Sequence, residues 1–428
     1  MKIVLILGAG RSSGYLIDYL LKYSDEMNTQ IWVADVDEKL AKTKIGNHPN
    51  GLTKSIALDD SFAIPNLVSK ADFVVSMLPA PMHVRVAQAC ILYKVSMATA
   101  SYATSEIRAL DQQAKDAGIT IMMECGLDPG IDHMSALQLI DVIKEKGGVV
   151  TSFKSYCGGL PAPESNDNPL HYKISWAPRN VVLAGQGGDA IYRENGHAVN
   201  VSYLELFKQV ETISVPGLGN LESYPNRDSL SYEKFYGIEG VLTLLRGTLR
   251  FPGFCNIWHK LIESGYTADD FNINQLDVNS FKALTAALDK HHVLENIKEE
   301  AEWLGLYSEK VLPPNVSTPA MVLQHVLEDK LMLKHGETDM IVMQHQIGYT
   351  LHNEAKHIHS TLVLKGENVT KTAMAKTVGL PLAIVVKRML RKEFDHTGVQ
   401  IPTHPSLYIP VLEELASNGI TFLEDGSV

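Results

Sequence analysis

Ile3-Val-Leu-Ile-Leu-Gly-Ala-Gly-Arg-Ser-Ser-Gly14 stands near the start of the chain and decides its fold. Ile3–Leu7 is a short, continuous apolar run, which is typical of a buried strand. It leads through Gly8-Ala9-Gly10 into a segment with a helical pattern that extends to Lys22. A strand, a Gly-x-Gly turn and a helix in this order are the context of the dinucleotide-binding fingerprint. The stretch therefore predicts the first βα unit of a Rossmann-type sheet.

Further strands are expected within the first third of the chain. Short apolar runs occupy residues 31–34, 73–78, 95–99 and 119–123, and helical patterns separate them. Strands that alternate with helices indicate βαβ units with right-handed crossovers, and hence a parallel sheet. We therefore expect an α/β protein whose first domain is a doubly wound parallel sheet.

The pattern changes near residue 148. Val149–Tyr156 predicts a strand, turn-rich segments follow, and residues 256–334 are mostly helical, most clearly at 283–306 and 320–333. Residues 340–351 and 357–364 predict a strand pair with a polar turn at Asn353-Glu354. Residues 372–391 predict a long apolar helix, kinked at Gly379 and Pro381, that lies in a core or in the seam of a homodimer.

These patterns divide the chain into three regions. We expect a dinucleotide-binding domain (1–130 with 395–428), a mixed α/β substrate and catalytic domain (131–255 with 335–394) and a small helical insert (256–334). A length of 428 residues fits two or three domains, and a hydrophobic content of 45% supports a substantial core.

The composition excludes several classes of protein. A net charge of −11 argues against a nucleic-acid partner, because a duplex-binding protein neutralises phosphates with a basic face. No apolar run is long enough to predict a membrane span, and the apolar run after Met1-Lys2 predicts a first strand and not a signal peptide. Cysteines are scarce and lack metal-binding spacing, so we expect a cytoplasmic protein without disulfides and without a metal.

The glycine-rich turn makes specific predictions about a cofactor. Its spacing is Gly-x-Gly-x-x-Ser, with the third glycine one residue late at Gly14. Asp35, at the end of the second predicted strand, is placed to accept hydrogen bonds from ribose hydroxyls and to repel a 2′-phosphate. Asp35 therefore favours NAD over NADP. The alternative is that Asp35 merely caps a turn.

Several motifs identify a family. The chain resembles the glutamate-forming saccharopine dehydrogenases, also called saccharopine reductases. The resemblance covers nearly the whole chain and rests on Leu127-Asp-Pro-Gly-Ile-Asp-His133, Ser155-Tyr-Cys-Gly-Gly-Leu-Pro-Ala-Pro-Glu164, Asp167-Asn-Pro-Leu170, Tyr224-Pro-Asn-Arg-Asp-Ser229, Arg246-Gly-Thr-Leu-Arg250, Trp303-Leu-Gly-Leu306 and Met343-Gln-His345.

The resemblance implies an activity in lysine metabolism and a cofactor. Glutamate and 2-aminoadipate 6-semialdehyde would condense to an imine, which a nicotinamide hydride reduces to saccharopine, and the reverse reaction would cleave saccharopine oxidatively. The family implies NADP(H). The expected cofactor-binding residues are Gly8, Gly10, Arg11, Ser12, Ser13, Asp35, Leu78, Pro79, Leu127, Asp128 and Pro129.

Saccharopine is a tricarboxylate amino-acid conjugate, so its cleft needs guanidinium groups as bidentate clamps. Arg227 and Arg250 match the family's substrate-binding positions. The other expected substrate contacts are Ser101, Tyr102, Lys173, Trp176, Thr248 and Leu249. Ala80 stands where the family often has tyrosine, which changes the contacts expected there.

Imine formation and hydrolysis require a positioned acid or base. Asp128, Tyr102 and Cys157 occupy matching positions and are the candidates for catalysis. Asp128 is alternatively a helix cap, Tyr102 a substrate contact, and Cys157 an inert buried thiol.

Two other functions are weighed against this one. An imine-reducing enzyme of polyamine synthesis (carboxynorspermidine or homospermidine type) would use acidic walls and aromatic faces rather than paired arginines. A non-catalytic nucleotide-sensing protein would not need Asp128, Tyr102, Arg227 and Arg250.

Overall fold

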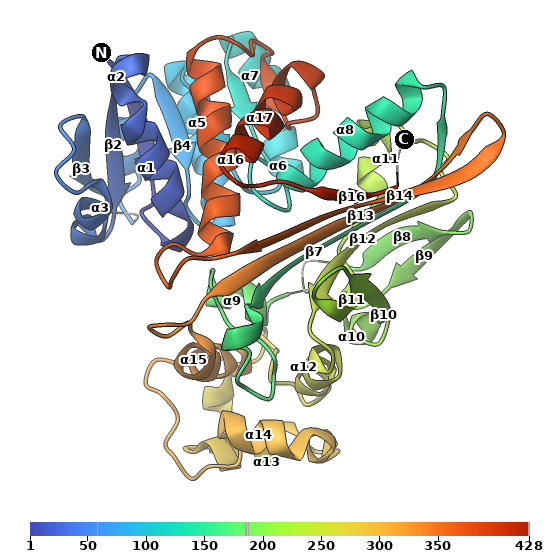
Figure 1. Ribbon diagram of the computed structural model, residues 1–428. Helices are drawn as coiled ribbons and strands as arrows, with labels where there is room; N and C mark the ends of the chain where they lie inside the picture. Colours follow the sequence, from blue (N-terminus) through green and yellow to red (C-terminus); the bar gives the residue numbers. More distant parts are fainter. Residues whose placement is uncertain (58, 185, 187, 427–428) are drawn as a thin grey trace. The chain divides into compact units, whose positions relative to one another are not determined.

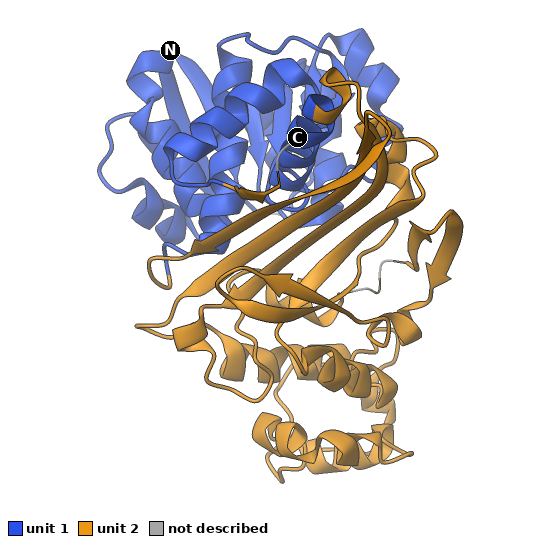
Figure 2. Cartoon of the chain, turned by 45° about the vertical axis from the view of Figure 1, so that its right-hand side comes forward, with its two compact units in different colours: residues 1–142, 370–421 blue, residues 143–369, 422–428 orange. Residues whose placement is uncertain are grey.

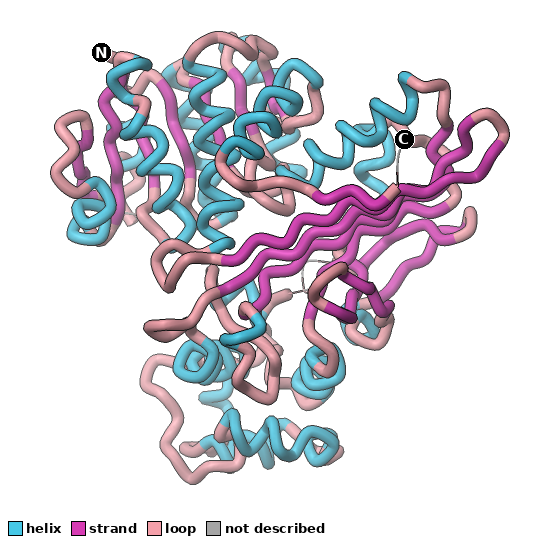
Figure 3. Tube along the Cα trace, viewed as in Figure 1, coloured by secondary structure: helices cyan, strands magenta, loops and turns pink. Residues whose placement is uncertain are grey.

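The computed structural model describes the chain except residues 58, 185, 187 and 427–428. It divides into two compact units. Unit 1 comprises residues 1–142 and 370–421, and unit 2 comprises residues 143–369 and 422–428 (Figure 2). Each unit contains its own sheet and its own helices. Figure 3 shows helices in cyan and strands in magenta.

Unit 1 is built on a parallel sheet. Its strand order is β3-β2-β1-β4-β5-β6-β15, and all pairs are parallel. The order reverses between β1 and β4, as in doubly wound dinucleotide-binding folds. The strands are β1 (Lys2–Leu7), β2 (Thr29–Asp35), β3 (Gly51–Ser55), β4 (Phe73–Ser76), β5 (Ser96–Thr99), β6 (Thr120–Met122) and β15 (Gly398–Gln400).

Helices cover both faces of this sheet. Leu5 and Leu7 of β1 belong to the core that packs against α4, α5 and α7. Val4 and Ile6 are equally buried and point to the other face, because successive side chains of a strand alternate. The helices of unit 1 are α1 (Gly14–Lys22), α2 (Ser24–Met27), α3 (Glu38–Ile45), α4 (Ala63–Val68), α5 (His83–Tyr93), α6 (Ser105–Arg108), α7 (Asp111–Ala117), α16 (Ala373–Leu390) and α17 (Pro405–Ser417) (Figure 1). α8 (Ile131–Glu145) runs from unit 1 into unit 2.

The prediction of a doubly wound parallel sheet is confirmed, but two of its strands were not predicted. β3 lies at the sheet edge and is half-exposed along its length, so it shows no apolar run. β15 has only three residues and comes from far along the chain to pair with β6. Edge position and short length remove the signals by which the other strands are recognised.

Unit 2 contains a mixed sheet. Its main path is β10-β11-β12-β7-β13-β14-β16, and β8 pairs with β12 and β9. Only the β12–β7 pair is parallel; the other described pairs are antiparallel. The strands are β7 (Val149–Pro161), β8 (Ala190–Glu194), β9 (His197–Val201), β10 (Glu211–Val215), β11 (Gly219–Pro225), β12 (Thr243–Arg250), β13 (Asp339–Leu351), β14 (Glu354–Lys365) and β16 (Leu423–Asp425).

The helices of unit 2 are α9 (Pro178–Val182), α10 (Tyr203–Leu206), α11 (Glu233–Tyr236), α12 (Phe254–Glu263), α13 (Phe281–Leu288), α14 (Lys298–Leu304) and α15 (Pro319–Leu331). All of them except α11 contribute to a core with β7, β11 and β12, whereas Tyr236 of α11 contacts Phe153 of β7. The helix predicted over 283–306 is interrupted. The Asp289 carboxylate accepts the backbone N–H groups of Val293 and Leu294 at 2.8 and 3.0 Å, and these bonds stabilise a turn between α13 and α14.

The predicted strand pair is confirmed as β13 and β14, with a shifted turn. His352 and Asn353 form the turn, both with positive φ (52° and 63°), rather than Asn353 and Glu354. A two-residue turn with positive φ at both positions matches the twist of antiparallel strands.

The expected domain boundaries require correction at the carboxyl-terminal end. Residues 370–394 were assigned to the catalytic domain but lie in unit 1, where α16 packs against α1. A Cβ at Gly379 would stand 2.8 Å from the Ser12 carbonyl oxygen, so glycine permits this close packing. Residues 422–428 belong instead to unit 2, because β16 pairs with β14.

α16 is mostly buried and forms part of the core of unit 1. In the described part of the chain no helix is both long and apolar enough to cross a membrane. All four cysteines are buried, and none of them forms a disulfide.

Candidate active site

The glycine-rich turn after β1 has the geometry of a dinucleotide cradle. Gly8 has φ +102°, and a Cβ there would stand 2.9 Å from the Met77 carbonyl oxygen, so only glycine fits. Gly10 is exposed, and a Cβ there would meet no atom within 4 Å. The open side of Gly10, just before the backbone N–H groups at the start of α1, leaves room for a pyrophosphate to approach.

Asp35 holds this turn from the end of β2. Its Oδ2 accepts the Ala9 N–H at 2.6 Å, and its Oδ1 accepts the Asp37 N–H at 2.9 Å. Asp35 thus caps the turn that follows β2, as the alternative interpretation of this residue predicted. The same carboxylate also braces the glycine-rich turn.

Lys44 of α3 was missed by the sequence analysis. Its ammonium donates hydrogen bonds to the Gly10 carbonyl and to Ser13 Oγ, the latter at 2.9 Å. Burial lowers the pKa of Lys44 to about 8, against the opposing attraction of Asp35 and Asp18. The sequence offered no signal, because a lysine late in an amphipathic helix is ordinarily a solvated residue.

Ser13 requires a correction. It was predicted to contact the cofactor, but it is fully buried, and its hydroxyl donates to the Gly10 carbonyl at 2.9 Å. Ser13 therefore shapes the turn from inside. Arg11 is exposed and Ser12 is half-buried at the same helix start.

The other predicted contacts of unit 1 lie at the same sheet edge, because β1, β4, β5 and β6 are parallel neighbours. They follow the carboxyl ends of β4 (Leu78, Pro79), β5 (Ser101, Tyr102) and β6 (Leu127, Asp128, Pro129). This edge is where open parallel sheets bind their ligands. Leu127 and Pro129 are buried, whereas Pro79 is exposed.

Tyr102 and Asp128 contact each other. The Tyr102 hydroxyl donates to Asp128 Oδ1 at 2.7 Å. A hydrogen bond to an ionised carboxylate stabilises the charged form. The tyrosine hydrogen is committed to this carboxylate, and the bond fixes the positions of both groups.

Glu124 fixes the loop that carries Tyr102 and was also missed. It is fully buried, accepts the Ala103 N–H at 2.9 Å, and lies 2.9 Å from His133 Nε2. These bonds, more than the opposing effect of its burial, lower the pKa of Glu124, with His133 the largest lowering contribution. His133 is therefore a hydrogen-bond partner of Glu124 in the interior of unit 1.

Unit 2 contains an arginine that lacks an acidic partner. Arg250 is 5% exposed and its Nε has no hydrogen-bond partner. Its guanidinium donates to the Leu249 carbonyl at 2.8 Å and to the Tyr224 hydroxyl at 3.4 Å. No ion pair of Arg250 is found among the described residues.

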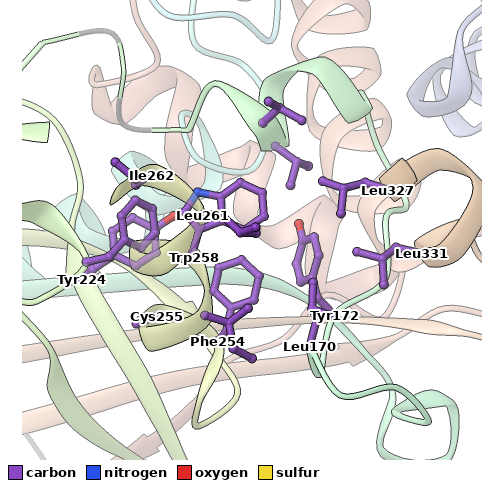
Figure 4. Packing of buried hydrophobic residues seen from close by; sticks show 14 of the residues in the cluster. Leu170, Tyr172, Tyr224, Phe254, Cys255, Trp258, Leu261, Ile262, Leu327 and Leu331 are labelled. Carbon is purple, nitrogen blue, oxygen red and sulfur yellow. The ribbon is translucent and has the colours of Figure 1, made fainter. Parts of the chain in front are cut away.

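Aromatic rings surround the Arg250 guanidinium. Its Cζ lies 5.0 Å from the ring centroid of Tyr172, 5.7 Å from that of Tyr224 and 5.2 Å from that of Phe254. Figure 4 shows these three side chains within the core of unit 2, where Phe254 also stacks on Trp258. We call Arg250 and the three rings of Tyr172, Tyr224 and Phe254 the Arg250 box. Since a buried cation needs a counter-charge, this box is suited to an anionic ligand.

The remaining residues of the two arginine motifs have different environments. Arg227 is exposed on the loop after β11, with φ +49°. Arg246 is buried with its Cζ 4.4 Å from the Tyr232 ring centroid. Leu249 is fully buried, so its side chain packs in the core and only its carbonyl, which holds Arg250, serves the site. Thr248 is half-buried on β12, opposite Tyr224 of β11.

Lys173 loses its support as a substrate contact. It is 3% exposed, and its ammonium lies 2.8 Å from Asp167 and 2.7 Å from Glu337. Its charge is therefore balanced within the protein. Trp176, by contrast, donates to the Tyr172 hydroxyl at 3.2 Å and so adjoins the Arg250 box.

Cys157 lies on β7 in unit 2, where it is 7% exposed and in register with Thr248 of β12. The other two candidates for catalysis, Asp128 and Tyr102, belong to unit 1.

Among the residues described, no His, Cys, Asp or Glu cluster could hold a metal ion. His345 of β13 is fully buried between Phe153 and Phe422.

Comparison with known proteins gives consistent matches. Residues 4–122 match the saccharopine dehydrogenase NADP binding domain, and residues 126–420 match the saccharopine dehydrogenase C-terminal domain. The mouse mitochondrial alpha-aminoadipic semialdehyde synthase is 36% identical over 98% of this chain, which spans 47% of that relative. The chain thus covers about half the length of such curated relatives.

Two further matches extend over full length. The saccharopine dehydrogenase [NADP(+), L-glutamate-forming] of Saccharomyces cerevisiae is 33% identical over 100% of this chain and 99% of its own length. The apo structure of the L-Glu-forming saccharopine dehydrogenase from that yeast superposes with a TM-score of 0.87 at 32% identity, covering 100% of both chains.

Proposed function

Since the chain belongs to the saccharopine dehydrogenase family, we propose that it interconverts saccharopine with glutamate and 2-aminoadipate 6-semialdehyde, as an oxidoreductase that uses a nicotinamide dinucleotide. In the direction of cleavage, a hydride leaves the carbon of the C–N bond on the aminoadipate side and gives an iminium. Water adds to that carbon, and the C–N bond breaks to release glutamate. A proton is released overall, which balances the reaction.

The observation that carries this proposal is the Arg250 box. A guanidinium that is buried among Tyr172, Tyr224 and Phe254 without an acidic partner in the described chain is complementary to a carboxylate. A tricarboxylate substrate supplies such groups. Arg227, which is exposed, remains the proposed second guanidinium for this substrate.

The glycine-rich turn fits the dinucleotide. Gly8 permits the sharp turn, Gly10 leaves space on its open side, and α1 supplies backbone N–H groups. When bound, the nicotinamide accepts or supplies the hydride. The protein's own contribution is to hold the dinucleotide at the carboxyl ends of β1 and β4, where the strand order reverses.

Proton transfer is assigned to Asp128. Tyr102 donates to its Oδ1 and orients the carboxylate, which suits a base that removes a proton from the attacking water or from the amine. Tyr102 stabilises this base and contacts substrate. Cys157 is proposed as a further group near the substrate, because it lies on β7 in register with Thr248, two residues before Arg250 on β12.

The choice between NAD and NADP depends on Asp35. The family match is to an NADP binding domain. Nevertheless, Asp35 and Asp37 place two carboxylates at the end of β2, where a 2′-phosphate would be repelled. We expect NAD to be used at least as well as NADP, and Asp35→Ser to shift the ratio of kcat/KM values toward NADP by about tenfold.

The test is a direct assay. Purified protein is incubated with saccharopine and either NAD or NADP, and nicotinamide reduction is followed. Turnover with saccharopine supports the proposal. Turnover of a polyamine adduct such as carboxynorspermidine without turnover of saccharopine would identify the second candidate, which the arginine box disfavours. A strong preference for NADP would overturn only the role of Asp35.

A further inference from the structure

A buried histidine lies behind Ser101 and connects it to the end of the neighbouring strand. His83 is the first residue of α5 and is 2% exposed. Its Nδ1 lies 2.9 Å from Ser76 Oγ, and its Nε2 lies 2.7 Å from Ser101 Oγ. Ser76 ends β4 and is fully buried, whereas Ser101 follows β5 and is only half-buried. A row of three side chains thus ends at a proposed substrate contact.

The backbone of Ser101 is held independently of this row. Its N–H donates to Thr99 Oγ1 at 3.3 Å, and its carbonyl accepts the Glu124 N–H at 3.0 Å. The position of Ser101 is therefore fixed by β5 and by the loop after β6. What His83 controls is the direction of the Ser101 hydroxyl hydrogen.

His83 is neutral, so its two ring nitrogens have different roles. Burial lowers the pKa of His83 to about 4, and no charged neighbour contributes to the shift. A neutral imidazole carries one N–H donor and one acceptor nitrogen. Two arrangements of the row are therefore conceivable, and they run in opposite directions.

Hydrogen-bond satisfaction distinguishes the two directions. If Nδ1 carried the proton, it would donate to Ser76 Oγ, and the Ser76 hydroxyl hydrogen would have no acceptor among the described residues. A buried unsatisfied donor is costly. If Nε2 carries the proton, Ser76 donates to Nδ1, and Nε2 donates to Ser101 Oγ. The hydrogen of Ser101 is then left for a ligand.

We propose that Ser76 and His83 are positioning residues that direct the hydroxyl hydrogen of Ser101 to a carboxylate of the substrate. The proposal rests on the function proposed above and adds a specific donor for one of the substrate's anionic groups. A carboxylate accepts hydrogen bonds and cannot donate them when ionised. A serine fixed as a donor therefore discriminates in favour of that group.

Two variants separate the two halves of the row. Asparagine at position 83 places its amide near the Nδ1 position and keeps a partner for Ser76, but it does not reach Ser101. Glutamine places its amide nitrogen near the Nε2 position and keeps a donor for Ser101. Both variants remove the imidazole and both disturb packing, so a purely structural role predicts similar losses for the two.

The kinetic test compares these variants with Ser101→Ala. We expect His83→Asn to raise KM for saccharopine about tenfold with kcat changed less than about threefold, and His83→Gln to restore KM to within about threefold of the parent. His83→Asn combined with Ser101→Ala should be no worse than Ser101→Ala alone. Nucleotide Kd, measured by direct binding, should stay within about twofold in every variant.

Other results would overturn the proposal. Equal increases in KM in His83→Asn and His83→Gln would assign His83 a structural role. Additive effects of His83→Asn and Ser101→Ala in the double variant would show that His83 does not act through Ser101. A loss of nucleotide affinity would make Ser101 a cofactor contact instead of a substrate contact.

A second measurement does not depend on activity. ¹⁵N NMR of histidine-labelled protein, with the His83 signal assigned by its absence in His83→Gln, reports which ring nitrogen carries the proton. We expect Nε2–H, and Nδ1–H would overturn the proposal. If the parent protein fails to oxidise saccharopine, the proposed function fails, and the tautomer still decides whether Ser101 is a fixed donor.

Discussion

Tyr102 donates its phenolic hydrogen to Asp128 over 2.7 Å, and this bond joins the loop after β5 to the loop after β6 in unit 1. The bond assigns the two residues different parts in the mechanism proposed above. Asp128 is the proposed base, and Tyr102 is the proposed partner that orients its carboxylate.

Substitution of this pair has a predicted kinetic signature. Asp128→Asn should lower kcat by about 100-fold or more, with nucleotide affinity unchanged, because a positioned base contributes a factor of that order. Tyr102→Phe removes the hydrogen bond that orients this carboxylate, so kcat should fall by about tenfold, less than in Asp128→Asn. Steady-state kinetics on both variants check this. An unchanged kcat in Tyr102→Phe would separate the two residues functionally.

Substitution of Arg250 should weaken the binding of saccharopine without lowering the stability of the protein. Arg250→Met should raise KM for saccharopine about 100-fold, since a charge-assisted pair with a carboxylate is lost. It should not lower the free energy of unfolding, because the substitution removes a buried charge that has no acidic partner in the described chain.

Arg193→Met is the matched control for Arg250. The Arg193 guanidinium forms an ion pair with Glu233, so its removal should destabilise unit 2 and leave KM nearly unchanged. Denaturant unfolding and steady-state kinetics on both variants check the comparison. A destabilised Arg250→Met with normal KM would mean that the aromatic box is structural.

Lys44 predicts a pH dependence of cofactor binding. The pKa of Lys44 is lowered to about 8, chiefly by burial, and Asp35, Asp18 and, through Asp18, Lys371 are the charged groups around it. Above pH 8 the ammonium loses its charge beside the glycine-rich turn, so affinity for the anionic dinucleotide should fall a few-fold between pH 7 and pH 9. Lys44→Met should bind weakly at both values. Titration by fluorescence tests this, and identical pH dependence in parent and variant would contradict it.

His83 predicts acid sensitivity of unit 1. Its folded pKa of about 4 lies below the ordinary value of 6.5, so between these values the unfolded chain binds the extra proton. Stability from this group is full above pH 6.5 and is lost as pH falls toward 4, by about 3 kcal/mol. The destabilisation of His83→Gln relative to the parent should therefore shrink from pH 7 to pH 4.5. If the difference in free energy of unfolding between His83→Gln and the parent were the same at pH 7 and pH 4.5, the low folded pKa of His83 would be refuted.

The sequence predicted those parts of the fold that local signals specify. β1, β2 and β4 have apolar runs bounded by turns. Gly8 indicates a turn at a position that only glycine can occupy. β15 and β16 have three residues each and owe their places to pairing with β6 and β14. Such pairings connect distant parts of the chain, and no local pattern reports them.

The candidate site shows the same division. Arg250 and Asp128 could be predicted as site residues from the sequence because they lie in recognisable motifs. His83, Glu124 and Lys44 were missed because each acts by supporting another residue from a neighbouring element. Conversely, Lys173 looked like a ligand contact until its two carboxylate partners were placed beside it. Burial and pairing decide these roles, and neither is visible along the sequence.

The central claim is that hydride transfer occurs at the carbon of the C–N bond on the aminoadipate side of saccharopine. The most direct measurement uses saccharopine that is fully deuterated at that carbon, with NAD as the acceptor, and analyses the products by mass spectrometry. We expect deuterium in the reduced nicotinamide together with glutamate that carries no label. Unlabelled reduced nicotinamide with release of lysine and 2-oxoglutarate, or no reduction of either NAD or NADP, would contradict it.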